Sequence, residues 1–140
     1  MGRVAIAGVN PELLDLMAHH DAVQDRAAGA TVTFAGVVRD QDGGASVIEL
    51  EYQAHPTAGA VVADVAADLA AREGVIAVAV THRYGLLGVG DIALVAAVSA
   101  AHRREAFEAC SDLVDEVKRR LPVWKRQVFT DGHDEWVGSA

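Results

Sequence analysis

The segment His102–Leu121 has the pattern of a long amphipathic helix, and this pattern most constrains the fold. Its apolar residues recur every three or four positions along one face. The segment ends at Pro122, which cannot continue a helix because it lacks a backbone N–H and its ring clashes with the preceding turn. A helix with one apolar stripe needs another layer of structure on which to bury it. The stripe comprises Ala106, Cys110, Val114, Val117 and Leu121.

The rest of the chain supplies that layer mainly as β-strands. Short runs that are rich in β-branched residues, or that alternate apolar and polar residues, predict strands. They lie at Arg3–Gly8, Gly29–Arg39, Val47–Tyr52, Val75–Tyr84, Asp91–Ser99, Val123–Phe129 and Glu135–Val137. The Gly-rich segment DQDGGAS favours a hairpin of the second and third strands. The segment GLLGVG is expected to be a link between the fourth and fifth, and Asp131-Gly132 a turn between the last two.

Two further helices are predicted. The first spans Pro11–His20 and is capped by Asn10; the second spans Thr57–Arg72. Because hairpins and helices are mixed without a strict β-α-β alternation, we predict an α+β fold in which helices pack on a mainly antiparallel sheet. The apolar faces of the two helices are Leu13, Leu14 and Met17, and Val61, Val65 and Leu69.

The chain has 140 residues, which fits a single domain spanning residues 1–140. Hydrophobic residues make up 51% and charged residues 23%, a globular composition. The single cysteine excludes an intrachain disulfide and a cysteine-rich zinc site. No apolar run approaches the ~20 residues of a membrane span, and the first residues do not resemble a signal peptide. We therefore expect a cytoplasmic protein that does not enter a membrane.

The formal net charge of −8 argues against a nucleic-acid-binding protein, which needs a basic face. The basic residues are nevertheless concentrated, since the stretch from Lys118 to Arg126 holds five of them and no acid. Such a segment indicates either a site for a small anion or acidic partner, or simply a solvated helix end.

His102, Arg103 and Arg104 stand at the start of the long helix, where the helix dipole disfavours cations. A bound anion would offset this, because it accepts hydrogen bonds from the free backbone N–H groups and from arginine together. Glu105 and Glu108 offer the alternative of local compensation. The sequence leaves both explanations open.

Lys118 and Lys125 are the only lysines in a chain that otherwise uses arginine. Lys118 borders the apolar stripe in the last helical turn, where a cation suits the helix dipole. The same position permits partial burial, which lowers a lysine pKa and makes the amine a better base or nucleophile. Trp124, between the two lysines, is expected in the core.

Strand ends supply further candidates. Arg39 ends a strand before the Gly-rich loop, which is a common place for a binding residue and equally for a solvated one. His82 and Arg83 end another strand in the same way.

Cys110 lies on the apolar stripe and is expected to be an inert residue of the core. The other histidines lack ligand spacing, so we predict no metal site and no cofactor, and we expect surface positions for His19, His20, His55 and His133.

Six segments, in order along the chain, together resemble the large, catalytic subunit of molybdopterin synthase, the MoaE family. They are GATVTFAGVVRD, VIELEYQAH, THRYGLLGVGD, SAAHRREAFEAC, VKRRLPVWKRQ and DGHDEWV, and they run from Gly29 to Val137. The ordered set is specific, whereas no single segment would suffice. The resemblance implies an α/β hammerhead-like fold with an additional small antiparallel sheet.

The resemblance also implies a sulfurtransferase of molybdenum cofactor biosynthesis. The family converts cyclic pyranopterin monophosphate (precursor Z) into molybdopterin by installing two sulfurs as a dithiolene. The sulfur arrives as a thiocarboxylate on the C-terminal Gly-Gly of a small ubiquitin-like, MoaD-like carrier subunit. Two large subunits form a central homodimer with one small subunit at each end, giving a heterotetramer.

The resemblance also implies roles for the residues of this chain that match the family's motifs. By resemblance, Lys118 is the catalytic lysine near the carrier tail and Lys125 is the second active-site lysine. The family's substrate pocket is formed in part across the dimer interface. Its residues correspond to Arg39, His102 and Arg103, and Arg104 is a further candidate directly beyond the His-Arg pair.

Two departures from the family pattern stand out. Gln127 occupies a place where the family often has an acid, so an ion pair made there is expected to be absent. The sequence stops at Ala140, where many relatives continue with a charged tail, so closure over the substrate is expected to differ. Two rival functions stay open: a non-catalytic dimeric module that binds a phosphorylated metabolite or partner tail, and a transferase that depends on Cys110.

Overall fold

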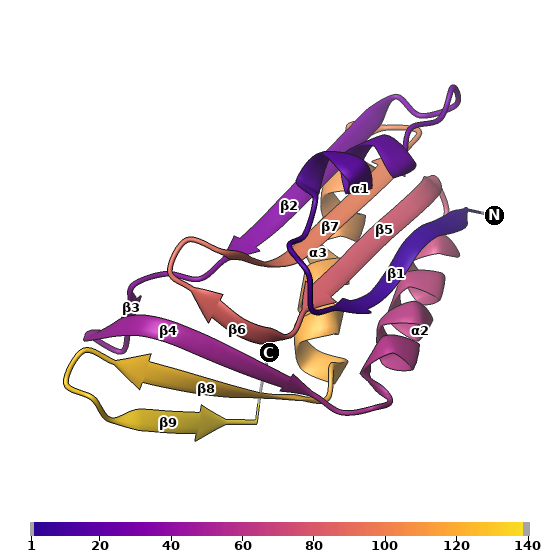
Figure 1. Ribbon diagram of the computed structural model, residues 1–140. Helices are drawn as coiled ribbons and strands as arrows, with labels where there is room; N and C mark the ends of the chain where they lie inside the picture. Colours follow the sequence, from indigo (N-terminus) through magenta and orange to yellow (C-terminus); the bar gives the residue numbers. More distant parts are fainter. Residues whose placement is uncertain (1, 139–140) are drawn as a thin grey trace.

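The larger of two sheets forms the centre of the molecule (Figure 1). The computed structural model describes residues 2–138. The strand order of this sheet is β1 (Arg3–Asn10), β5 (Val75–Arg83), β7 (Ile92–Ala100) and β2 (Ala30–Val37). β1 pairs with β5 in parallel, and the other pairings are antiparallel.

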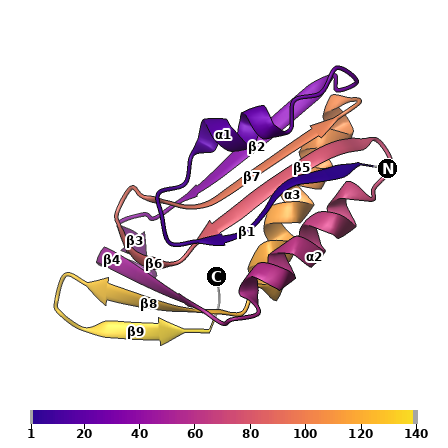
Figure 2. The ribbon, with the colours of Figure 1, turned by 45° about the vertical axis from the view of Figure 1, so that its right-hand side comes forward.

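Helices cover both faces of this sheet (Figure 2). They are α1 (Leu16–Ala22), α2 (Ala58–Ala70) and α3 (Arg103–Arg120). Side chains alternate across a strand, so one face of β5 places Val78 and Val80 in the main core with residues of α2 and α3. The other face places Ala77 and Ala79 in a small core with Val23, directly after α1.

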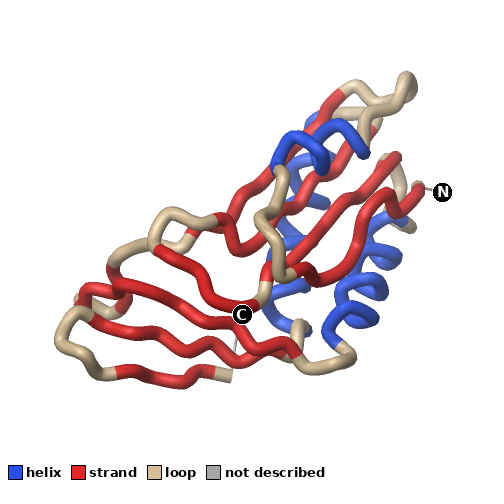
Figure 3. The backbone as a smooth tube through the Cα atoms, viewed as in Figure 1, coloured by secondary structure: helices blue, strands red, loops and turns tan. Residues whose placement is uncertain are grey.

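A second, antiparallel sheet extends from one end of the first (Figures 1 and 3). Its inner face adds Leu50, Tyr52 and Val123 to the main core, while Trp124 and Trp136 are about half exposed. Its strands run in the order β3 (Gln41–Asp42), β4 (Ala45–Ala54), β8 (Val123–Phe129) and β9 (Asp134–Val137), and β6 (Gly85–Gly88) also pairs with β4.

The structure confirms the predicted α+β fold, with helices on a mainly antiparallel sheet and an additional antiparallel sheet. The long helix lies within one residue of its predicted bounds, and Pro122 follows its end. The predicted turn at Asp131-Gly132 joins β8 to β9, with Gly132 at a φ of 91°, which favours glycine.

The predicted hairpin of Gly29–Arg39 with Val47–Tyr52 is wrong. β2 pairs with β7, and β4 pairs with β8 and β6. The chain leaves the larger sheet after β2, and Gly43 and Gly44, at φ of 58° and 83°, instead turn β3 back onto β4. The expected link GLLGVG also proved partly wrong, because its first four residues form β6.

The first helix begins later than predicted. Asp15, and not Asn10, caps it: Asp15 Oδ1 accepts a hydrogen bond from the N–H of Ala18 at 3.0 Å. Leu13 precedes the helix and is 77% exposed, so it forms no buried face. His19, expected at the surface, is buried, and its Nε2 lies 2.8 Å from Oγ1 of Thr81.

Two apolar residues, Trp124 and Val61, are less buried than predicted. Trp124 is 48% exposed and does not belong to the core, because its strand turns that side of β8 outward. In α2 the fully buried position is Val62 and not Val61, although Val65 and Leu69 are buried as predicted.

Candidate active site

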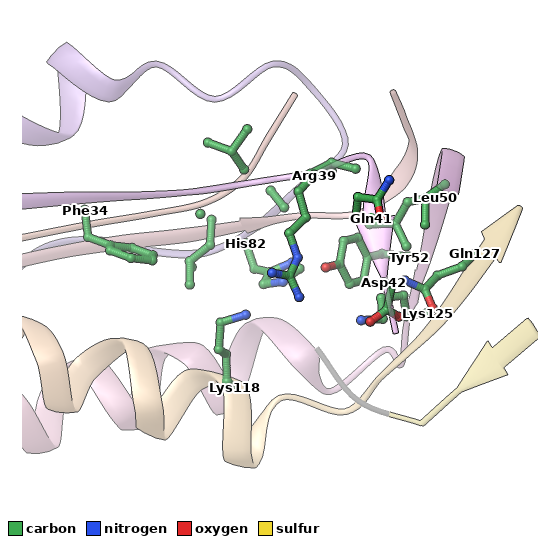
Figure 4. Close-up of a pocket in the computed structure, with 16 residues that line it drawn as sticks. Phe34, Arg39, Gln41, Asp42, Leu50, Tyr52, His82, Lys118, Lys125 and Gln127 are labelled. Carbon is green, nitrogen blue, oxygen red and sulfur yellow. The ribbon is translucent and has the colours of Figure 1, made fainter. Parts of the chain in front are cut away.

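A pocket of about 230 Å³ lies where the second sheet meets the end of α3 and the strand ends of the larger sheet. Residues from β2, β3, β4, β5, β7, α3 and β8 line it, so segments far apart in sequence converge there. Among the lining residues are the predicted candidates Arg39, Lys118 and Lys125 (Figure 4).

Lys118 reaches the pocket from the last turn of α3. Its neighbour Val117 is buried in the main core and fixes the rotation of the helix. Lys118 is therefore anchored at the edge of the buried face, and its amine points into the pocket (Figure 4). Although much of the residue is exposed, burial of the ammonium lowers the pKa of Lys118, and the charge of Lys125 lowers it further.

Lys125 reaches the pocket from β8. Pro122 ends the helix and directs the chain into this strand, where Lys125 lies opposite Tyr52 of β4 in the antiparallel register. The turn at Pro122 thus brings both lysines of the chain to one pocket. Neither forms a salt bridge to an acid within residues 2–138.

Arg39 follows β2 at the crossover between the two sheets. Figure 4 shows its guanidinium pointing into the pocket toward His82. Together with Lys118 and Lys125 it gives the lining three cationic side chains, against one acid, Asp42. Such a concave, electropositive site suits an anionic ligand.

His82, which the sequence marked only as a strand-end candidate, and Tyr52, which sequence reasoning did not single out, also line the pocket. The two rings meet edge to face at 4.8 Å. His82 Nδ1 donates a hydrogen bond to the carbonyl of Arg83 at 2.7 Å, so its Nε2 carries no proton in the neutral ring. Desolvation lowers the pKa of His82 to about 4, assisted by the charge of Lys118. Burial also raises the pKa of Tyr52, so both groups are neutral near pH 7.

His102, Arg103 and Arg104 lie elsewhere, at the opposite end of α3. They are exposed and line a separate hollow with Phe107 and Glu108. At a helical rise of about 1.5 Å per residue, Arg103 and Lys118 are separated by about 22 Å along α3. One chain therefore does not bring these two groups of candidates to the same cavity.

Cys110 faces the core from the middle of α3. It is 3% exposed, and burial raises the pKa of its thiol to about 11. The predicted core position of Cys110 is confirmed, and such a buried thiol supplies little thiolate near pH 7. Residues 2–138 contain no His, Cys, Asp and Glu cluster that could hold a metal ion. Nor does any helix in that range have the length and apolar character of a membrane span.

The amino-acid sequence is similar to those of proteins of known family. The family model described as MoaE protein matches residues 9–120. Two relatives named molybdopterin synthase catalytic subunit are similar to the chain. The one from Bacillus subtilis is 38% identical over 117 residues, covering 83% of this chain and 74% of the relative. The one from Nostoc sp. is 41% identical over 126 residues, covering 89% and 76%.

The fold is also similar to solved structures of the same family. The crystal structure of molybdopterin synthase from Staphylococcus aureus matches with a TM-score of 0.86 at 30% identity, covering 94% of this chain and 96% of that one. A MoaE protein from Burkholderia ambifaria matches with a TM-score of 0.79, also at 30% identity, covering 100% and 90%. The chain belongs to the MoaE protein family.

Proposed function

We propose that this chain is the catalytic subunit of a molybdopterin synthase. In this role it transfers sulfur from the thiocarboxylated C-terminal Gly-Gly of a small ubiquitin-like carrier to precursor Z, and so forms the dithiolene of molybdopterin. Membership of the MoaE family supports the proposal. The single observation that carries it is the convergence of Lys118, Lys125 and Arg39 on one pocket.

The chemistry of both ligands suits this pocket. The carrier tail ends in a negative thiocarboxylate and precursor Z bears a phosphate, so both need positive charge inside a protein whose net charge is −8. The chain's own thiol is buried, and burial favours its protonated form, which supports a sulfur source outside the chain.

In the proposed reaction the thiocarboxylate sulfur attacks a side-chain carbon of the pyranopterin. The carbon–oxygen bond at that carbon breaks, and its oxygen either stays on the phosphate or leaves as water. The new carbon–sulfur bond links carrier and substrate as a thioester. Water then cleaves the bond between the carrier's acyl carbon and the sulfur, so the carrier leaves as a carboxylate and the sulfur stays on the pterin. A second charged carrier repeats the transfer at the adjacent carbon.

Lys118 has two roles in this scheme. As an ammonium it orients the thiocarboxylate and offsets charge in the transition state. Because its pKa is lowered, it also supplies a larger fraction of neutral amine for proton transfer than a lysine with the ordinary pKa does. Lys125 and Arg39 hold the phosphate and pterin from the other sides of the pocket.

His102, Arg103 and Arg104 enter the proposal through a second copy of the chain. Their separation of about 22 Å from Lys118 along α3 is too large for one small ligand to contact both in one copy. In a central homodimer within a heterotetramer, the partner copy would present these residues at the pocket of the first. Two carriers would then occupy the two ends.

The test is Lys118→Ala, assayed with purified thiocarboxylated carrier and precursor Z. We expect molybdopterin formation to fall at least a hundredfold, since charge stabilisation and proton transfer each contribute about that factor. Arg119→Ala is the matched control, because Arg119 is the next residue, is ion-paired to Glu116 and does not line the pocket. Undiminished activity of Lys118→Ala would remove Lys118 from the chemistry. Carrier binding by the wild-type protein without turnover would favour the non-catalytic module.

A further inference from the structure

Gln127 is a polar side chain that lines the pocket and is buried, in the described part of the chain, without a hydrogen-bond partner for its carbonyl oxygen. The residue is 6% exposed, yet its carbonyl oxygen Oε1 has no hydrogen-bond partner among the described residues. Leaving a buried acceptor unpaired costs free energy, so natural proteins rarely do so without a reason.

The side chain is held at the pocket by its strand. β8 lies between β4 and β9, and Gln127 is in register with Leu50 on one side and Glu135 on the other. Lys125 and Gln127 are two residues apart, so they share the face of β8 that lines the pocket. Figure 4 shows Gln127 beside Lys125.

Gln127 does not serve to anchor either lysine. Within residues 2–138 its side chain forms no hydrogen bond, and Lys118 and Lys125 form none to it. A neutral amide also adds no negative charge beside the two ammonium groups, whereas a carboxylate at this position would add one. Both features suit a pocket that binds a ligand with an N–H group and an anionic group.

We infer that Gln127 is a positioning residue of this site, whose amide oxygen accepts a hydrogen bond from an N–H group of the bound ligand. Its neutrality keeps the positive charge of Lys118 and Lys125 available for that ligand's anionic group. This inference rests on the proposed function. The N–H group belongs either to the peptide backbone of the carrier tail or to the pterin ring, and the experiment distinguishes the two.

The variants are Gln127→Met, which keeps the length of the side chain and removes the acceptor, and Gln127→Glu, which keeps an acceptor and adds a charge. Gln53→Met is the matched control, since Gln53 is an exposed glutamine on β4 that does not line this pocket. Titrations measure binding of precursor Z and of a synthetic peptide with the carrier's C-terminal sequence. Steady-state kinetics with the thiocarboxylated carrier and thermal unfolding complete the set.

For Gln127→Met we expect binding of one probe to weaken about three- to tenfold, the value of one hydrogen bond, with KM rising more than kcat falls. Weaker peptide binding assigns the N–H to the carrier tail, and weaker precursor Z binding assigns it to the pterin. The unfolding temperature without ligand should stay the same or rise, because the variant removes an unpaired buried acceptor. A merely structural role would lower it.

For Gln127→Glu we expect the limb of the pH–rate profile that depends on Lys118 to move to higher pH, because a carboxylate stabilises the nearby ammonium. Gln127→Met should leave that limb in place.

Unchanged binding of both probes by Gln127→Met, or a fall in its unfolding temperature that accounts for lost activity, would overturn the inference. If the wild-type protein binds both probes but makes no molybdopterin, the proposed function fails while the binding comparison still tests Gln127.

Discussion

The charge of Lys125 on β8 lowers the pKa of Lys118 on α3, across the pocket that both residues line. The turn at Pro122 creates this relationship, since it ends the helix directly after the turn that carries Lys118 and starts the strand that carries Lys125. Desolvation is the larger cause of the lowered pKa and the Lys125 charge the smaller one. Removing Lys125 should therefore reverse only part of the shift.

The lysine pair can be tested by NMR. In Lys125→Met we expect the pKa of Lys118 to rise toward its ordinary value without reaching it, because burial remains. The chain has no other lysine, so the variant has a single lysine side-chain signal, whose titration reports Lys118 directly. An unchanged or lower pKa would mean that the two ammonium groups do not interact.

His82 should make stability depend on pH. Its pKa is about 4 in the folded protein and about 6.5 when unfolded, so the unfolded chain binds the extra proton. The contribution of His82 to the free energy of unfolding is fully present above pH 6.5. It falls by about 3 kcal/mol as the pH is lowered to 4. Denaturant unfolding of the wild type and His82→Gln at pH 7 and pH 4.5 measures this. The variant should lose clearly less stability over the same interval; an equal loss would place the effect in other groups.

Replacing the cysteine should leave catalysis intact. Cys110→Ala removes one buried sulfur from the core beside Ala96, so we expect a loss of about 1 kcal/mol in unfolding free energy and near-wild-type molybdopterin formation. Denaturant unfolding and the sulfur-transfer assay measure the two effects. A folded variant without activity would favour a transferase that depends on Cys110.

The proposed dimer makes a prediction about mixed variants. If Lys118 of one copy acts with Arg103 of the other, a mixture of inactive Lys118→Ala and Arg103→Ala chains regains activity after subunit exchange. Half of the dimers are mixed and each has one intact site, so roughly a quarter of wild-type activity should return. A mixture of Lys118→Ala and Lys125→Ala is the control and should stay inactive, because both residues belong to one pocket. No recovery in the first mixture would argue that one copy supplies all the residues.

Local patterns determined much of this protein before its structure was known. The apolar stripe and Pro122 specified α3 because helix periodicity and the missing proline N–H act within one segment. The strands from Val75 and from Val123 were likewise predicted nearly to their ends. The two lysines stood out by composition alone, since the chain uses arginine everywhere else.

Only the tertiary structure decided which strands pair and which residues share a pocket. The hairpin predicted for Gly29–Arg39 failed because strand partners are chosen by burial across the whole molecule and not by adjacency in sequence. The sequence marked His82 and Gln127 but could not show that both are buried in one pocket, since their burial exists only where the two sheets meet. Periodicity acts over a few residues and can be read from the chain, whereas desolvation and charge coupling depend on distances that only the folded molecule sets.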